Sequence, residues 1–191
     1  FESELRRLVA KDYPILRRML SYEEAMTYFS SEGRHDKVLL LQHHNTPFVA
    51  TLCCDGFMDL HAFPVVASTG SLGVFSFMPY EDGCVINLPN RENSSIPMEF
   101  VPQKELIRVH REHTHWGNIL GVRSVGELNQ AVFDRRISDV IMMSEALHNK
   151  KFAELATNII EKDKRLVLIA GPSSAGKTTS AKRLMTHLKV N

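Results

Sequence analysis

Residues 171–179 restrict the possible folds of this chain more than any other segment. They follow the pattern G-x-x-x-x-G-K-[ST], and the apolar residues 165–170 precede them. A helical pattern comes next, with Ala181, Leu184 and Leu188 on one face. A short apolar run is typical of a strand that is buried on both faces. Strand, glycine-containing loop and helix, in this order, are the context that the pattern requires, so we expect the first β-loop-α unit of an α/β fold.

The residue types of this loop suit the phosphate groups of a nucleotide. Backbone N–H groups at a helix N-terminus attract anions, and glycine permits a tight turn and a close approach of the backbone. Lys177 is expected to bring its ammonium group to the β- and γ-phosphates, and the Thr178 hydroxyl to bind Mg²⁺. The residues predicted to bind the phosphates are Gly171, Ser173, Ser174, Ala175, Gly176, Lys177, Thr178 and Thr179.

The composition is that of a soluble globular protein. The chain has 191 residues, of which 43% are hydrophobic and 24% are charged, enough for one domain or for one domain and part of another. The formal net charge of +1 argues against a protein that binds duplex nucleic acid or a membrane surface. No apolar run approaches the roughly 18 residues of a membrane-spanning helix. Three cysteines without metal-ligand spacing indicate reduced thiols in a cytoplasmic protein.

Hydrophobic patterning divides the sequence into three parts. Residues 1–122 read as an α+β region, residues 123–164 as a helical connector, and residues 165–191 as the truncated start of a P-loop domain. The chain begins without an initiator methionine and ends directly after the predicted helix over residues 177–189. We therefore expect a fragment of a longer protein.

The α+β region combines helical patterns with short β-rich runs. Residues 4–11 and 103–120 are expected to be helical, and the capping box Ser21–Glu24 begins another helix. A second capping box, at residues 124–127, begins the connector. The predicted strands are residues 38–42, 48–52, 57–61, 74–77 and 84–88, with a turn at Asn45, Thr46 and Pro47. Connections this short favour an antiparallel or mixed sheet with helices on one face.

Several motifs of this region match a known domain. They are ELRRLV at residues 4–9, YP at 13–14, SYEEA at 21–25, CDGFMDL at 54–60 and STG at 68–70. On these motifs, residues 1 to about 121 resemble the second additional domain of threonyl-tRNA synthetase, which edits mischarged tRNA. The resemblance implies the fold of that editing domain.

The residues that edit in that family are not all found here. The family uses a His-x-x-x-His pair and a later Cys-x-x-x-His pair after an Asp-Leu step. In this sequence His61 stands at the cysteine position and Val65 at the second histidine position, and no two histidines are four residues apart. Valine neither binds a metal nor moves a proton. We therefore predict a vestigial editing cleft with Asp59 and a packed His61, in which Asp59 serves the fold or the chemistry.

The chain as a whole resembles bacterial uridine-kinase-like nucleoside kinases of the phosphoribulokinase and uridine kinase class. The resemblance rests on the order of its parts, which is an editing-like domain, a helical connector and the sequence IAGPSSAGKTT at residues 169–179. The resemblance implies a Mg²⁺-dependent enzyme that transfers a phosphoryl group from ATP or GTP to the 5′-hydroxyl of a nucleoside, with uridine as the expected substrate. Lys177 would be the catalytic residue that stabilises the migrating charge, and Thr178 would hold the metal. The nucleoside-binding residues and the catalytic acid would come after residue 191, so the chain alone is expected to be inactive.

Two other functions stay open. The first is a non-catalytic module, derived from a synthetase editing domain, that binds a tRNA end or a small ligand and regulates the domain attached to it. The kinase interpretation makes tRNA an unexpected partner. The second is an active deacylase, which Val65 disfavours.

The remaining histidines and cysteines are weaker candidates. His110 and His113 would share a helix face and could bind a metal, but no carboxylate or cysteine is placed to complete the ligand shell, so we expect a solvated face with Trp116 packed inward. The pairs at residues 43–44 and 53–54 directly follow the predicted strands 38–42 and 48–52, and the two residues of each pair would be adjacent if the strand continued. Their side chains would point to opposite faces, so neither pair is expected to chelate a metal.

Overall fold

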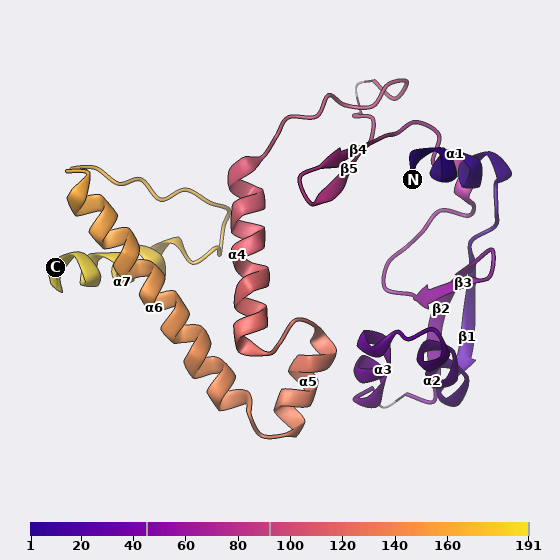
Figure 1. Cartoon of the computed structure of the whole chain (residues 1–191), viewed down its shortest axis with the longest axis horizontal. Coiled ribbons are helices and arrows are strands. Elements are labelled where there is room, and N and C mark those ends of the chain that lie inside the picture. Colours follow the sequence, from indigo (N-terminus) through magenta and orange to yellow (C-terminus); the bar gives the residue numbers. More distant parts are fainter. Residues whose placement is uncertain (45, 92, 191) are drawn as a thin grey trace. The chain divides into compact units, whose positions relative to one another are not determined.

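The computed structural model describes residues 1–44, 46–91 and 93–190 (Figure 1). The chain divides into two compact units, Phe1–Arg108 and Val109–Asn191. The division falls within α4 (Lys104–Leu120). Helices occur in both units and the described strands in the first, so the α+β class predicted from the sequence is confirmed.

A three-stranded antiparallel sheet lies at the centre of the first unit. Its strands are β1 (Leu16–Ser21), β2 (Phe48–Cys54) and β3 (Phe57–Leu60), with β2 in the middle. Asp55 and Gly56 connect β2 to β3 with φ angles of 47° and 82°. Positive φ at both positions is the geometry of the tight hairpin turn that Asp-Gly favours, so this hairpin is a consequence of the local sequence.

Two helices, α2 (Tyr22–Ser31) and α3 (His35–Gln42), supply the core that covers this sheet. The capping box predicted at the start of α2 is confirmed: the Ser21 hydroxyl accepts a hydrogen bond from the Glu24 amide, and the Glu24 carboxylate accepts one from the Ser21 amide. This cap fixes the first turn of α2 and therefore the direction of its apolar face. The buried side chains of the core are Ala25, Phe29, Leu41 and Val49.

A second, two-stranded sheet consists of β4 (Ser76–Tyr80) and β5 (Gly83–Asn87), which pair antiparallel. The described residues therefore form two small antiparallel sheets, whereas we expected one sheet from the short connections. The strand predicted over residues 74–77 begins two residues later than expected. Asn45, part of the predicted turn, lies outside the described residues.

The first helix, α1 (Glu2–Lys11), is tied to the short 3₁₀ helix Thr69–Ser71. The Thr69 hydroxyl donates to the Leu8 carbonyl at 2.7 Å and accepts from the Tyr13 amide at 2.9 Å. The Gly70 amide donates to the Asp12 carboxylate. The ELRRLV, YP and STG motifs, far apart in the sequence, thus form one hydrogen-bonded contact.

The second unit is helical over most of its length. After α4 come α5 (Val125–Phe133), α6 (Ile137–Glu161) and α7 (Lys177–Val190). Figure 1 shows α7 beside α6, where the rings of Phe152 and His187 stack with centroids 6.3 Å apart.

The strand predicted over residues 38–42 is wrong, because these residues form most of α3. A short run of apolar residues has no distinct period, so sequence alone does not separate a strand from a buried helix. Leucine is a good helix former, and the helix places Leu41 against Phe29 in the core. The strand β1 was missed because its mostly exposed residues, Arg17 and Arg18 among them, do not alternate between apolar and polar.

The strand predicted over residues 165–170 is not formed. Leu166 and Leu168 are 77% and 84% exposed, so the expected burial on both faces is absent as well. A strand requires a hydrogen-bonding neighbour, and the described residues place none beside this segment. The β-loop-α unit is therefore not confirmed: the structure has its loop and its helix only.

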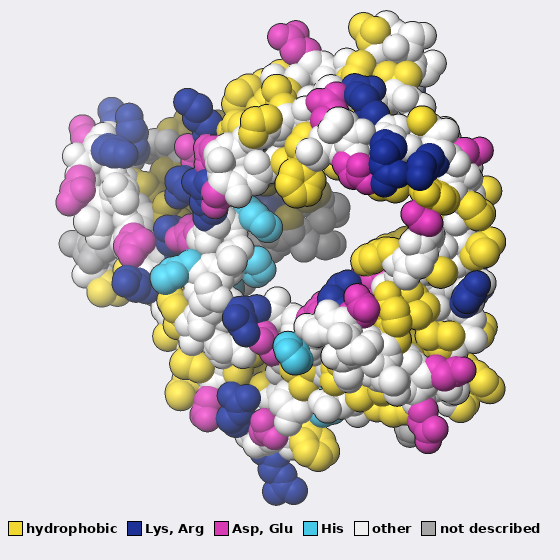
Figure 2. All heavy atoms as spheres, turned by 45° about the vertical axis from the view of Figure 1, so that its right-hand side comes forward, with side chains coloured by type: hydrophobic (Ala, Val, Ile, Leu, Met, Phe, Trp, Pro, Cys, Tyr) yellow, Lys and Arg dark blue, Asp and Glu magenta, His cyan; other side chains and the backbone are white. Residues whose placement is uncertain are grey.

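Acidic and basic side chains lie next to one another on the face shown in Figure 2, in keeping with the net charge of +1. Within the described part of the chain, no helix combines the length and the apolar composition that crossing a bilayer requires.

Candidate functional sites

The loop of residues 171–176, which precedes α7, is held in a turn by hydrogen bonds to the Pro172 carbonyl. The Lys177 ammonium donates to the Pro172 carbonyl at 2.5 Å, and the Ala175 amide points to the same oxygen at 3.4 Å. Ser174 and Gly176 have φ angles of 60° and 73°. The left-handed conformation at Gly176 favours glycine, which accounts for that residue at the entry to the helix.

The first amides of α7 lie outside its ladder of helical hydrogen bonds. The first helical hydrogen bond runs from the Ser180 amide to the Gly176 carbonyl at 2.9 Å. The amides of Lys177, Thr178 and Thr179 therefore precede the helical ladder, and such groups attract negative charge. The Thr178 side chain is exposed and offers one hard oxygen ligand of the kind that Mg²⁺ prefers. The predicted phosphate-binding residues thus lie together in one loop and one helix turn.

Asp59, predicted to lie in the vestigial cleft, is held by two cations of the neighbouring helix α3 and its entry. Its carboxylate lies 2.9 Å from Lys37 Nζ and 3.6 Å from the Arg34 guanidinium, and it accepts a hydrogen bond from the Leu60 amide. Partial burial opposes ionisation, but these hydrogen bonds and charges outweigh it and lower the pKa of Asp59. A carboxylate that stays ionised and paired is a structural anion and a poor general acid or base.

This pairing predicts a pH-dependent contribution to stability. Because the pKa of Asp59 is lower in the folded than in the unfolded chain, its contribution is present above about pH 3.9 and is lost as the pH falls through the folded-state pKa. We expect Asp59→Asn to lower the unfolding free energy at pH 7 by at most about 1 kcal/mol, as for partly exposed ion pairs. Urea unfolding from pH 7 to pH 2.5 measures this difference, which should shrink as the pH falls below about 3.9. Asp55→Asn in the adjacent turn is the control, and a pH-independent difference would contradict the assignment.

His61, the residue at the cysteine position of the editing motif, lies on the wall of a cavity of about 280 Å³. Its amide donates to the Ala50 carbonyl, while its Nδ1 is buried and has no hydrogen-bond partner among the described residues. The other lining residues are Leu40, Leu41, His44, Val49, Ala50 and Leu60. The cavity is thus lined mostly by apolar side chains, with His44 and His61 as its polar residues. Val65 is half exposed and is not among the lining residues.

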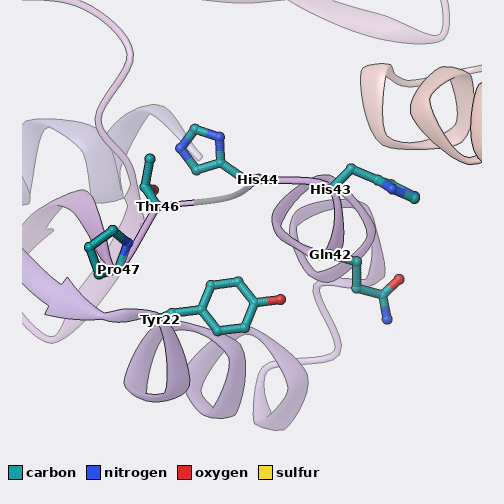
Figure 3. A pocket seen from close by; sticks show the side chains of 6 residues that line it. All are labelled: Tyr22, Gln42, His43, His44, Thr46 and Pro47. Carbon is teal, nitrogen blue, oxygen red and sulfur yellow. The ribbon is translucent and has the colours of Figure 1, made fainter.

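A second hollow, of about 520 Å³, adjoins the end of α3 (Figure 3). Tyr22 extends along one side of it, His44 lies on the other, and Thr46 and Pro47 close one end. His44 lines both this hollow and the His61 cavity. Sequence reasoning missed Tyr22 and Thr46, which only the folding of α2 against the loop brings together. None of the lining residues that the structure describes is a carboxylate or a cysteine, so the hollow suits polar binding rather than metal or nucleophilic chemistry.

The other histidine and cysteine candidates do not assemble into a metal site. In the described ranges, no three His, Cys, Asp or Glu side chains gather in a geometry that could hold a metal ion. His43 and His44 come after the end of α3, so the prediction that they lie on a strand is wrong. Cys53 and Cys54 lie on β2 as predicted and are free thiols.

Comparison with known proteins identifies relatives for part of the chain. Over 78 residues it is 37% identical to the threonine–tRNA ligase of Syntrophomonas wolfei, 38% to that of Acidovorax sp. (strain JS42) and 35% to that of Symbiobacterium thermophilum. Each match covers 40% of this chain and 12% of the relative, so the aligned part is a small portion of these ligases. No family model and no solved structure matches the chain. Part of the chain is therefore related to threonyl-tRNA synthetases, and the comparisons bring no support for the kinase resemblance.

Proposed function

We propose that the synthetase-related part of this chain is a small-ligand-binding module that does not catalyse editing. The observation that carries the proposal is the His61 cavity, because its mostly apolar wall includes a histidine whose buried Nδ1 has no hydrogen-bond partner among the described residues. A buried polar atom of this kind gains free energy from a ligand that satisfies it. The groups expected of an editing reaction are not free to act. Val65, which stands at a histidine position of the editing motif, carries no ligand atom, and the Asp59 carboxylate is paired with Lys37.

The ligand suited to this cavity is small, with a hydroxyl or amino group beside an apolar portion. Threonine and serine are the probes of choice, because their hydroxyl could bond to His61 Nδ1 and the relatives are named threonine–tRNA ligases. The proposal for the module favours such a ligand over a tRNA end, since the net charge of +1 offers little electrostatic attraction for RNA.

Binding is tested by NMR titration of the 191-residue chain with L-threonine and L-serine. We expect saturable shifts of the His61 imidazole signals with at least one of the two. His61→Ala should remove binding, and His35→Ala, a histidine outside the cavity, should retain it. The absence of binding, or hydrolysis of mischarged tRNA by the chain, would each contradict the proposed non-catalytic module.

We further propose that residues 171–179 bind the phosphates of ATP or GTP with Mg²⁺, in a kinase that phosphorylates the 5′-hydroxyl of a nucleoside, with uridine as the leading substrate. The closed loop ahead of α7 supports phosphate binding, since Lys177 already lies against the loop and three helix-terminal amides precede the helical ladder. The nucleoside and the reaction rest on the sequence resemblance alone.

In such an enzyme, the bound metal would neutralise charge on the β- and γ-phosphates. This chain's own part is to bind and to position. The amides of the first turn of α7 would hold the phosphate oxygens, the Thr178 hydroxyl would contribute one oxygen ligand, and the Lys177 ammonium would leave the Pro172 carbonyl for the phosphates.

The test of the kinase proposal is a screen of the longer protein that it requires. The protein is incubated with ATP or GTP, Mg²⁺ and each nucleoside in turn, and nucleoside monophosphate is measured. We expect uridine to give UMP. If the nucleotide binds and no nucleoside is phosphorylated, the kinase assignment is wrong and the phosphate site stands; if no nucleotide binds, both fail.

A further inference from the structure

A third cavity, of about 530 Å³, lies wholly within the second unit. Three segments surround it: the second half of α4, the connection into α5 with the first turns of that helix, and the middle of α6. This volume lies in the range of pockets that hold small molecules. Neither of the functions proposed above makes use of it.

Close backbone packing fixes two walls of this cavity. A Cβ atom at Gly117 would come within 3.1 Å of the Val122 carbonyl oxygen, so glycine allows the connection to lie directly on α4. The Val122 amide in turn donates to the Gly117 carbonyl at 3.0 Å. The third wall is held by Lys151 of α6, which pairs with Glu112 of α4 at 2.5 Å. α4 is therefore linked to the connection before α5 by backbone packing, and to α6 by an ion pair.

Aromatic rings line the part of the cavity between α4 and α6. Trp116 and His148 contact each other edge to face, with centroids 5.2 Å apart and an interplanar angle of 77°, and His113 lines the same cavity. Because the two rings are nearly perpendicular, they do not stack face to face. A flat ligand ring could therefore take an offset-stacked position on one of them. The apolar side chains on the remaining walls are Leu120, Val122, Val125 and Leu128.

The polar groups of the cavity are suited to an uncharged ligand. Arg123 is the arginine on its wall, and its guanidinium is engaged by Glu127 at 2.7 Å, while the Arg123 amide donates to the same carboxylate. Its charge is thus largely compensated. Ser124 and Ser144 contribute hydroxyls, and Ser124 Oγ already accepts from the Glu127 amide, which leaves its O–H to donate.

We propose that this cavity binds an uncharged, planar heteroaromatic molecule of nucleobase or nucleoside size. Its ring would stack on Trp116 or His148 and meet the other of these two rings edge to face, and its ring heteroatoms and hydroxyls would bond to Ser144, Ser124 and the imidazoles. A phosphorylated or otherwise anionic ligand is disfavoured, because Glu127 already compensates the charge of Arg123. The inference depends only on the second unit.

Trp116 makes the proposal directly measurable, because it is the only tryptophan of the chain. The 191-residue chain is titrated with uridine, adenosine or ribose, and tryptophan emission is monitored, with isothermal calorimetry as the independent readout. We expect saturable quenching with at least one nucleoside and no binding of ribose, which lacks the planar ring. Equal responses to ribose and to the nucleosides, or no binding of either nucleoside, would overturn the proposal.

Variants locate the binding site. His148→Ala and Ser144→Ala should each weaken nucleoside binding by about 2- to 12-fold, the range expected for one hydrogen bond. His110→Ala, which removes a histidine of α4 outside the cavity, should leave affinity unchanged. Circular dichroism confirms that each variant is folded. Nucleoside binding that neither cavity variant weakens would place the ligand elsewhere and refute the assignment.

Discussion

Replacing Lys177 with alanine is expected to weaken the binding of Mg·ATP to the chain by about 10- to 100-fold, which is the usual contribution of hydrogen bonds to a charged group. The reason is positional. The ammonium group already lies 2.5 Å from the Pro172 carbonyl at the first turn of α7, beside the amides that precede the helical ladder. It therefore needs only a side-chain rotation to reach an anion held there. A fluorescent ATP analogue or calorimetry measures the loss.

The matched control for this prediction is Lys182→Ala. Lys182 is exposed on the same helix, so the control changes the net charge equally without altering the loop. If both variants lose affinity to the same degree, the attraction is a general effect of charge and the loop is not the site. Thr178→Ala should reduce affinity in Mg²⁺ more than in EDTA, because its hydroxyl is proposed to act through the metal.

The sequence was sufficient to predict a structural element wherever that element depends on residues adjacent to it along the chain. The capping box at Ser21, the Asp55-Gly56 hairpin and the helix that begins at Lys177 are each determined by a few adjacent residues. Their energetics are local, because a cap or a positive φ angle is satisfied within one turn.

The sequence was insufficient where a structure depends on a distant partner. Residues 38–42 form a helix because Leu41 enters a core made with α2 and β2, and nothing in the run itself distinguishes this outcome from a strand. Residues 165–170 show the converse case, in which an apolar run with high strand propensity stays exposed because no described strand pairs with it.

The candidate sites, too, could be predicted from the sequence where their residues are adjacent along the chain, and could not where the residues come from separate segments. All predicted phosphate-binding residues lie in one continuous segment, so their proximity could be predicted. The His61 cavity and the Trp116 cavity each draw residues from three separated segments. For His61, the motif resemblance indicated the residue, but the apolar walls and the buried Nδ1 emerged only from the packing of α3 against β2 and β3.

Phe29→Ala is expected to destabilise the first unit by about 3–5 kcal/mol, the cost of removing a buried aromatic side chain and leaving a cavity. Phe29 is fully buried at the centre of the small core with Ala25, Leu41 and Val49. Its ring also supports Tyr28 edge to face at 5.3 Å, and the Tyr28 hydroxyl accepts from the Met58 amide of β3. The variant therefore loosens α2, α3 and the hairpin together.

Since domains are stable by about 5–15 kcal/mol, a loss of this size brings the first unit close to unfolding at 37 °C. Hydrogen exchange of β2 amides measures the effect, and exchange should rise by about two to four orders of magnitude, because each 1.4 kcal/mol corresponds to a factor of ten. Phe57→Ala is the control: this ring is 59% exposed on β3, and its loss should cost less than about 1 kcal/mol. Equal exchange in the two variants would mean that the packing of α2 and α3 on the sheet, and with it the His61 cavity, is not the arrangement in solution.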